Sequence, residues 1–339
     1  MELAFFVEWI IKAVLMLAFL IVGFAYTTYL ERKTLARMQV RYGPNRAGPF
    51  GLLQPVADGV KLIFKEELIP KKADKLIFIL APILTLIPAL VMLAVVPFGG
   101  TINLFGREIS LSIAGDLNIG VLYITAIASI SVYGVVLAGW ASNNKYAMMG
   151  GIRSTAQMIS YELALALAFI GPILLASTMS VNGIVSAQGR IGWFIIFQPI
   201  GIIIFFIATL AEINRSPFDM PEAEQELTAG YHVEYSGMKF ALFMMTEYIK
   251  MIVISVLCAT LFLGGYLGPF VDQVPWLGPV YLGIKTLLLM FLIIWIRATM
   301  PRIRYDRLMA FGWKILLPLA LFNVFLTGVI IILFPNYFS

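Results

Sequence analysis

The stretch IIFQPIGIIIFFIATLAEINRSPFDMPEAEQEL, residues 195–227, joins an apolar run to an acidic one. Its first half, Ile195 to Leu210, is almost without polar residues. Its second half, Ala211 to Leu227, sets five carboxylates against the single cation Arg215. Because carboxylates at the mouth of a membrane helix are costly to keep ionised, this junction predicts proton handling or a binding cavity.

The chain as a whole is as apolar as the first half of this stretch suggests. Of its 339 residues 60% are hydrophobic and 13% charged, and the mean hydropathy is +0.92, well above that of soluble domains. A helix needs about 20 apolar residues to cross the hydrocarbon of a bilayer. The sequence therefore predicts an all-α polytopic membrane protein with eight transmembrane helices, at about 4–29, 76–98, 119–139, 156–178, 193–211, 240–264, 280–299 and 315–335.

The cations indicate an orientation for these eight spans. Of the 24 Lys and Arg residues, 19 fall in the connections that follow the first, third, fifth and seventh spans, whereas only Arg107 and Arg190 fall in the opposite connections. The positive-inside rule then places both termini outside, and it places the long first connection (30–75), the fifth (212–239) and the seventh in the cytoplasm or its equivalent. The net charge of +5 reflects this topology and gives no reason to expect nucleic acid.

The first connection contains a helical pattern of its own. Apolar residues recur at three- and four-residue spacing between polar ones: Leu52, Leu53, Val56, Val60, Ile63 and Phe64. This spacing predicts an amphipathic interfacial helix. Two interpretations stay open: a helix on the lipid surface, or the floor of a crevice that binds an amphiphile.

Single copies of Cys and His exclude several kinds of site. An iron–sulfur cluster needs about four thiolates, a bis-His haem two imidazoles, and a disulfide two cysteines. With only Cys258 and His232, we expect this chain to bind no metal and no redox cofactor by itself. We interpret Cys258 as a small packing residue and His232 as a solvated loop residue.

Ionisable residues also fall inside the predicted spans. If Ser154 or Thr155 caps the fourth span, Glu162 lies about two turns within it. Glu247 and Lys250 can pair at i, i+3 in the sixth span, and Lys285 in the seventh is a further candidate partner. Embedded acids with nearby bases are typical of a proton path.

Ordinary helix capping accounts for only part of the acidic run. Asp219 can cap a helix with Pro221 in its first turn and Glu222 at N3, while Glu224 points elsewhere. Capping does not explain Glu212 or Glu226. These two acids therefore remain the candidates for a functional role.

Four separate motifs carry a family resemblance. They are ERKTLARMQVRYGPNRAGPFGLLQPVADGVKLIFKE, GWASNNKYAMMGGIRSTAQMISYE, AEINRSPFDMPEAEQELTAGYHVEYSGMKFALFMMTEY and RATMPRIRYDRLMAFGWKILLP. In this order they resemble the H subunit (mitochondrial subunit 1) family of respiratory complex I, the proton-pumping NADH:quinone oxidoreductase. The resemblance extends from about residue 20 to 320.

The resemblance implies a quinone chamber and a proton path. The chamber and its entrance would be lined by Glu31, Arg32, Arg41, Arg46, Asp58, Arg215, Phe218, Glu222, Glu224, Arg297 and Arg302. The hydrophilic axis that couples quinone chemistry to proton movement would begin at Glu162, Glu212 and Glu247, with Glu226 near its mouth.

The resemblance also implies partners and a location. Peripheral-arm subunits would carry the terminal iron–sulfur cluster and the quinone headgroup ligands, with FMN and NADH further along that arm. Small membrane-arm subunits would flank the hydrophilic axis. The expected location is a bacterial cytoplasmic membrane, with the mitochondrial inner membrane as the alternative.

Two alternative functions stay open at this point. One is the homologous membrane subunit of an energy-converting hydrogenase or of a quinone reductase that takes electrons from another donor. The other is a standalone ion antiporter, which the long first and fifth connections disfavour because they indicate a docked partner.

Overall fold

The computed structural model describes residues 2–104, 107–219, 229–271 and 273–335. Helices make up about three quarters of this part, and within it seven helices are long and apolar enough to cross a membrane. The elements, in chain order, are α1 (Glu2–Met38), η1 (Pro49–Gly51), α2 (Gln54–Ile63), α3 (Lys75–Val91), η2 (Met92–Val95), β1 (Thr101–Leu104), β2 (Arg107–Ser110), α4 (Gly120–Ala141), α5 (Lys145–Ala176), α6 (Val181–Ile191), α7 (Phe194–Phe197), α8 (Pro199–Glu212), η3 (Gly230–His232), α10 (Gly237–Phe262), α11 (Leu277–Thr299), α12 (Tyr305–Phe311), η4 (Gly312–Leu316) and α13 (Leu317–Leu333).

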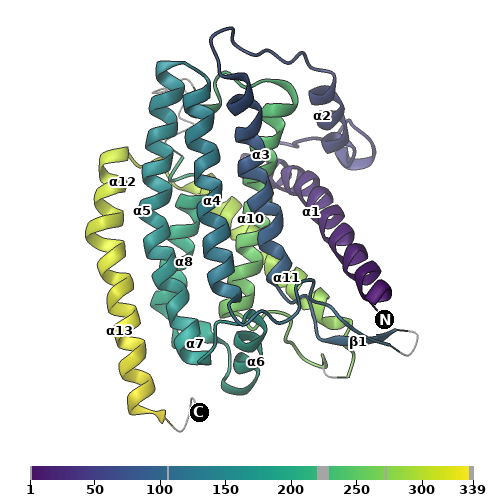
Figure 1. Cartoon of the computed structure of the whole chain (residues 1–339), viewed down its shortest axis with the longest axis vertical. Helices are drawn as coiled ribbons and strands as arrows, with labels where there is room; N and C mark the ends of the chain where they lie inside the picture. The colour runs from purple at the N-terminus through teal and green to yellow at the C-terminus, as the bar shows by residue number, and fades with distance from the viewer. Residues whose placement is uncertain (1, 105–106, 220–228, 272, 336–339) are drawn as a thin grey trace.

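The helices form a bundle with α1 and α13 on opposite flanks (Figure 1). Helix α1 leans away from the others and contacts α2, α10 and α11, whereas α13 packs on α5 and α8. Apolar side chains on α1, from Phe6 to Tyr26, remain exposed. Such a surface is suited to lipid or to a neighbouring protein rather than to water.

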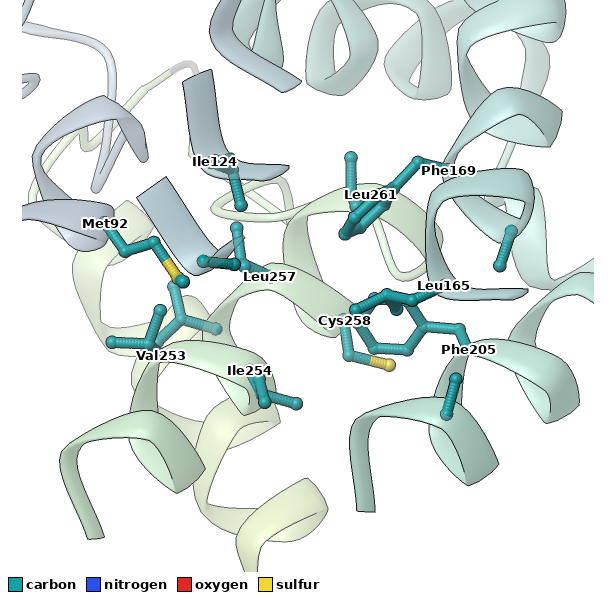
Figure 2. Packing of buried hydrophobic residues seen from close by; sticks show 14 of the residues in the cluster. Met92, Ile124, Leu165, Phe169, Phe205, Val253, Ile254, Leu257, Cys258 and Leu261 are labelled. Carbon is teal, nitrogen blue, oxygen red and sulfur yellow. The ribbon is translucent and has the colours of Figure 1, made fainter. Parts of the chain in front are cut away.

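Buried apolar side chains of α5, α8 and α10 meet in the centre of the bundle. Figure 2 shows Cys258 of α10 among Leu165 of α5 and Phe205 of α8. Cys258 is 1% exposed, which agrees with its interpretation as a small packing residue.

The fifth predicted span, 193–211, differs most from its prediction. It divides into the four-residue α7 and the 14-residue α8, which at 1.5 Å per residue is only about 21 Å long. The break lies at Gln198, since Pro199 has no N–H and restricts the residue before it. The Gln198 side chain joins α13, donating to Thr327 Oγ1 at 2.5 Å and accepting from Asn323 Nδ2 at 2.9 Å.

The fourth span begins earlier than its predicted start at 156. Asn144 caps α5 by accepting a hydrogen bond from the Tyr146 N–H, so neither Ser154 nor Thr155 is the cap. Glu162 therefore lies about five turns inside α5 rather than two. The first span is also longer than predicted, because α1 continues through Glu31 as far as Met38.

A β-hairpin is present although the sequence predicted an all-α protein. Strands β1 and β2 pair antiparallel, with Thr101 opposite Ser110. The hairpin lies near the N-terminal end of α1 (Figure 1).

Connections distant in sequence meet at the other end of the bundle. The Leu68 N–H donates to Ser236 Oγ at 3.1 Å, and Asn144 Nδ2 donates to Glu234 Oε1 at 2.7 Å. The Ile303 N–H donates to the Pro217 carbonyl at 3.0 Å. The segments that follow α1, α4, α8 and α11 thus form one layer.

His232 belongs to this layer and is buried rather than solvated, so its interpretation as a solvated loop residue is wrong. The residue is 7% exposed, and its ring packs against Tyr231 and Phe240. Burial lowers the pKa of His232, and the Glu247 carboxylate opposes that shift in part.

Candidate functional site

A buried carboxylate on α1 starts a chain of charged groups. Glu31, 3% exposed, accepts from Arg215 Nη1 at 3.4 Å and forms a second ion pair with Arg297 of α11. Three segments far apart in sequence therefore meet at one carboxylate. Glu31 Oε2 is buried and has no hydrogen-bond donor within the described residues, so this oxygen keeps an unused acceptor site.

Arg215 links Glu31 to α10. Its Nη2 lies 3.4 Å from Glu247 Oε2, and its guanidinium lies 4.4 Å from the centre of the Tyr248 ring. Burial disfavours the charge of Arg215, but the carboxylates of Glu247 and Glu31 outweigh that effect and raise its pKa. A cation held between two acids in this way stays charged and keeps both carboxylates in place.

The turn that carries Arg215 is fixed by amide side chains. Gln157 of α5 donates to the carbonyls of Ala211 at 2.8 Å and Phe218 at 2.9 Å. Asn214 adopts a left-handed conformation, with φ of 55°, and donates to Ser154 Oγ at 3.0 Å. Asn tolerates this conformation better than most residues, so the turn can aim Arg215 into the bundle.

One turn beyond Glu247, Lys250 continues the chain into the middle of α10. It is buried and donates to Ser131 Oγ of α4 at 2.7 Å. Its ammonium also interacts electrostatically with the carboxylates of Glu212, Glu162 and Glu247. Lys250 was predicted to pair with Glu247. Glu247 instead forms its ion pair with Arg215, and it is only one of the three carboxylates that act on Lys250.

The chain ends at two carboxylates around a small cavity. Glu212 of α8 and Glu162 of α5 both line an internal space of about 20 Å³. Glu162 also accepts a hydrogen bond from Ser129 Oγ of α4. A space of this size has room for about one water molecule, and among its mostly apolar lining the polar side chains are those of the two acids, Thr125 and Thr209.

The charges in this chain do not cancel. Its members, in spatial order, are Arg297, Glu31, Arg215, Glu247, Lys250, Glu212 and Glu162. Four carboxylates against three cations leave one negative charge if all seven ionise. Burying a charge without a partner is costly, so the balance of this set depends on every member keeping its partners.

Lys285 stays outside the chain, although it was a candidate partner for the buried acids. It donates to the carbonyls of Leu263, Gly265 and Leu267 at 2.7–2.8 Å. These carbonyls follow the C-terminal end of α10, so the ammonium caps that end of the helix.

Other predicted chamber residues form separate pairs. Arg32 lies 2.5 Å from Asp58 of α2, and Arg302 lies 3.0 Å from Asp219. Burial raises the pKa of Asp58, but the hydrogen bond and charge of Arg32 outweigh it and leave that pKa below its usual value. Phe218 is buried with its ring 5.6 Å from that of Tyr161.

Two predicted residues lie apart from these pairs, and three fall outside the described part. Arg41 donates to Gln39 Oε1 on the exposed turn after α1, and Arg46 is exposed beyond it. Glu222, Glu224 and Glu226 lie outside the described residues. Of the predicted capping box at 219–222, only Asp219 is described.

Comparison with known proteins places this chain in a family. The family model described as NADH dehydrogenase matches residues 11–328. The NADH-quinone oxidoreductase H subunit of Geobacter metallireducens that is numbered 2 is 50% identical, over 98% of this chain and 97% of its own length. The H subunits of Thermomicrobium roseum and Rickettsia canadensis are each 52% identical, over 90% and 94% of this chain and 91% and 92% of their own lengths.

The chain belongs to the NADH dehydrogenase family of H subunits. The resemblance of the four sequence motifs is thereby confirmed. Among the described residues of this family member, no three His, Cys, Asp or Glu side chains are grouped as metal ligands.

Sequence reasoning missed the residues that position the charged chain in this member of the NADH dehydrogenase family. Gln157 and Asn214 hold the Arg215 turn, and Ser129 and Ser131 of α4 contact Glu162 and Lys250. A usable signal existed only for the two serines, because hydroxyls inside an apolar span often satisfy a buried polar partner.

Proposed function

We propose that this chain is the membrane subunit of a proton-translocating NADH:quinone oxidoreductase, in which it forms part of the quinone chamber and couples quinone reduction to proton translocation. The observation that carries the proposal is the series of charged side chains from Glu31 near the end of α1 to Glu162 in the middle of α5. Ion pairs join its members as far as Glu247, and electrostatic interactions through Lys250 link them to Glu212 and Glu162. The names of the relatives support this function over that of a hydrogenase component.

Electrons reach the quinone from partner subunits. These peripheral-arm subunits carry NADH, FMN and the iron–sulfur clusters, and the last cluster lies beside the chamber together with the quinone headgroup ligands. Small membrane-arm subunits flank the charged chain beyond Glu162. The complex lies in a bacterial cytoplasmic membrane with both termini of this chain outside, as the distribution of Lys and Arg favours.

The chamber residues divide by position. Arg32 with Asp58 and Arg302 with Asp219 stand at the layer of connections, where exposed ends of both arginines can meet a quinone or a partner. Phe218 is the buried apolar wall. Arg41 and Arg46 contribute from the first long connection. Glu222, Glu224 and Glu226 lie outside the described residues, and their roles in the chamber and the proton path rest on the family resemblance alone.

Coupling follows from the charge balance. Reducing a quinone to a quinol consumes two electrons and two protons, so a closed chamber is left short of protons. Glu31 supplies the first response, because it shares Arg215 with Glu247. A change in its charge alters how firmly Arg215 holds Glu247, and the effect passes through Lys250 to the pair Glu212 and Glu162.

Replacing Glu212 tests this proposal. In the assembled complex, Glu212→Gln keeps the shape of the side chain but cannot carry a proton. We expect quinone reduction or the number of protons pumped per NADH to fall several-fold, measured in proteoliposomes with a pH-sensitive dye.

Glu234→Gln provides the matched control for this measurement. Glu234 lies in the layer of connections, bonded to Asn144 and outside the charged chain, so its replacement should leave activity and stoichiometry unchanged. Unchanged activity and stoichiometry in the Glu212 variant would contradict the proposal.

A further inference from the structure

An apolar groove runs along the outer flank of the bundle between α1 and α11, with α10 as its floor. Its volume is about 540 Å³, and its lining includes Leu15 and Phe19 of α1, Ile252 of α10 and Leu287 of α11. The lining residues of α1 extend from Lys12 to Leu30, which at 1.5 Å per residue is about 27 Å. This is close to the thickness of the hydrocarbon core.

A second hollow, of about 1330 Å³, lies at one end of the groove. It is lined by the last turns of α1, the turn that follows, and Phe291 of α11. Tyr26 and Leu30 line both hollows, so the two spaces meet there.

Three cations stand among the apolar and aromatic side chains that line the second hollow, whereas the first hollow has one cation among its described lining residues, Lys12, which pairs with Glu8. Lys33 and Arg37 line the second hollow one turn apart on α1, and Arg41 lines it from the turn that follows. Within the described part of the chain none of the three forms an ion pair: Lys33 lies 5.7 Å from the Tyr29 ring centre, and Arg41 bonds the neutral Gln39. The hollow therefore presents three positive charges to whatever enters it.

The junction of the two hollows coincides with a membrane boundary. On α1, the run of exposed apolar residues that starts at Phe6 ends at Tyr26, and a dense run of charged residues starts at Glu31, after Glu2, Glu8 and Lys12 near the N-terminal end. On α11, Phe291 and Trp295 are exposed just before Arg297. Aromatic side chains followed by cations are typical of the level where acyl chains give way to headgroups.

We propose that the two hollows together hold one anionic phospholipid, with its phosphate beside Lys33 and Arg37 and its acyl chains in the groove between α1 and α11. The ligand must be negative at one end to match the three cations, and apolar and elongated at the other to fill the groove. A neutral quinone ring lacks the charge, and an acidic protein segment lacks the acyl chains. Basic hollows between transmembrane helices recognise anionic headgroups by this chemistry.

Lipid titration of the complex tests the charged half of the site. The purified, delipidated complex is titrated with short-chain phosphatidylglycerol, and bound lipid is counted by native mass spectrometry, with phosphatidylcholine as the neutral probe. Lys33→Gln combined with Arg37→Gln should weaken phosphatidylglycerol binding about thirtyfold, since each cation near a headgroup contributes about 1 kcal/mol. Phosphatidylcholine binding should change little.

Lys71→Gln with Lys72→Gln is the matched control, because both lysines are exposed in the same connection and line neither hollow. Equal phosphatidylglycerol affinity in the Lys33/Arg37 variant and in this control overturns the proposal. Loss of peripheral-arm subunits from the Lys33/Arg37 variant, with its lipid affinity intact, overturns it in favour of a protein partner.

A second pair of variants tests the apolar half without touching any charge. Leu287 lines the groove and Leu288 does not, and both are exposed on α11. Leu287→Trp should fill the groove and lower phosphatidylglycerol affinity several-fold, whereas Leu288→Trp should not. Equal affinities in these two variants contradict acyl-chain binding between α1 and α11.

Discussion

At the scale of single residues, Arg215 determines the site. It is the one cation in the acidic run that the sequence singled out, yet its two described ion pairs lie with Glu31 and Glu247, outside that run. All three side chains are buried, so the stability of the arrangement is sensitive to substitution of any one of them. Removing one partner of a buried ion pair leaves an uncompensated charge.

Replacing Arg215 should therefore be costly. We expect Arg215→Met to destabilise the protein by about 3–5 kcal/mol and to lower the yield of assembled complex. The control is Arg304→Met, since Arg304 and Asp306 form an exposed pair worth less than about 1 kcal/mol. Thermal unfolding of the purified complex distinguishes them, and equal midpoints would show that the Arg215 pairs contribute no more than a surface pair.

His232 makes the stability of the layer of connections depend on pH. Burial lowers its pKa in the folded protein below the usual 6.5, so the unfolded chain binds a proton that the folded chain excludes. The stability that the neutral form of His232 contributes is fully present above pH 6.5, and it is lost as pH falls toward the lowered pKa of the folded protein. The thermal midpoint should fall between pH 7.5 and 5.5 by a larger amount in the native complex than in His232→Gln. Identical pH dependence in the two would contradict this account.

At the scale of elements, composition and periodicity predicted where helices lie better than where they begin and end. The pattern of Leu52 to Phe64 predicted a helix that the structure has as α2. The apolar pattern could not predict the break at Gln198. The run of apolar residues is the same whether the helix is continuous or is interrupted where the Gln198 side chain bonds α13. Nor could the pattern predict the hairpin β1–β2, whose strands are only four residues long.

The Gln198 break has a testable role in joining α8 to α13. Gln198→Leu removes the partner of buried Thr327 and Asn323, which should cost about 1–3 kcal/mol in the free energy of unfolding. The exposed Gln39→Leu should be nearly neutral. The two variants are compared by denaturant-induced loss of helical signal in the same detergent, and equal stability would deny the amide any structural role.

At the scale of the whole molecule, the site exists only because the connections meet at one end. Glu31, Arg215 and Arg297 come from segments more than 80 residues apart, and no local spacing indicates their contact. The sequence nominated these residues through the family motifs and nominated Glu162, Glu212 and Glu247 as embedded acids. Their order along one path, with Lys250 between Glu247 and Glu212, required the packing of α4, α5, α8 and α10.

The central claim is that quinone reduction changes the protonation of the acids around the small cavity. Infrared difference spectroscopy of the complex, oxidised minus reduced, measures this directly as a change in the protonated-carboxyl band. We predict that the native complex shows such a change and that Glu212→Gln loses or shifts it, while Glu234→Gln keeps it. A carboxyl difference spectrum that is the same in the native complex and in Glu212→Gln would contradict the account.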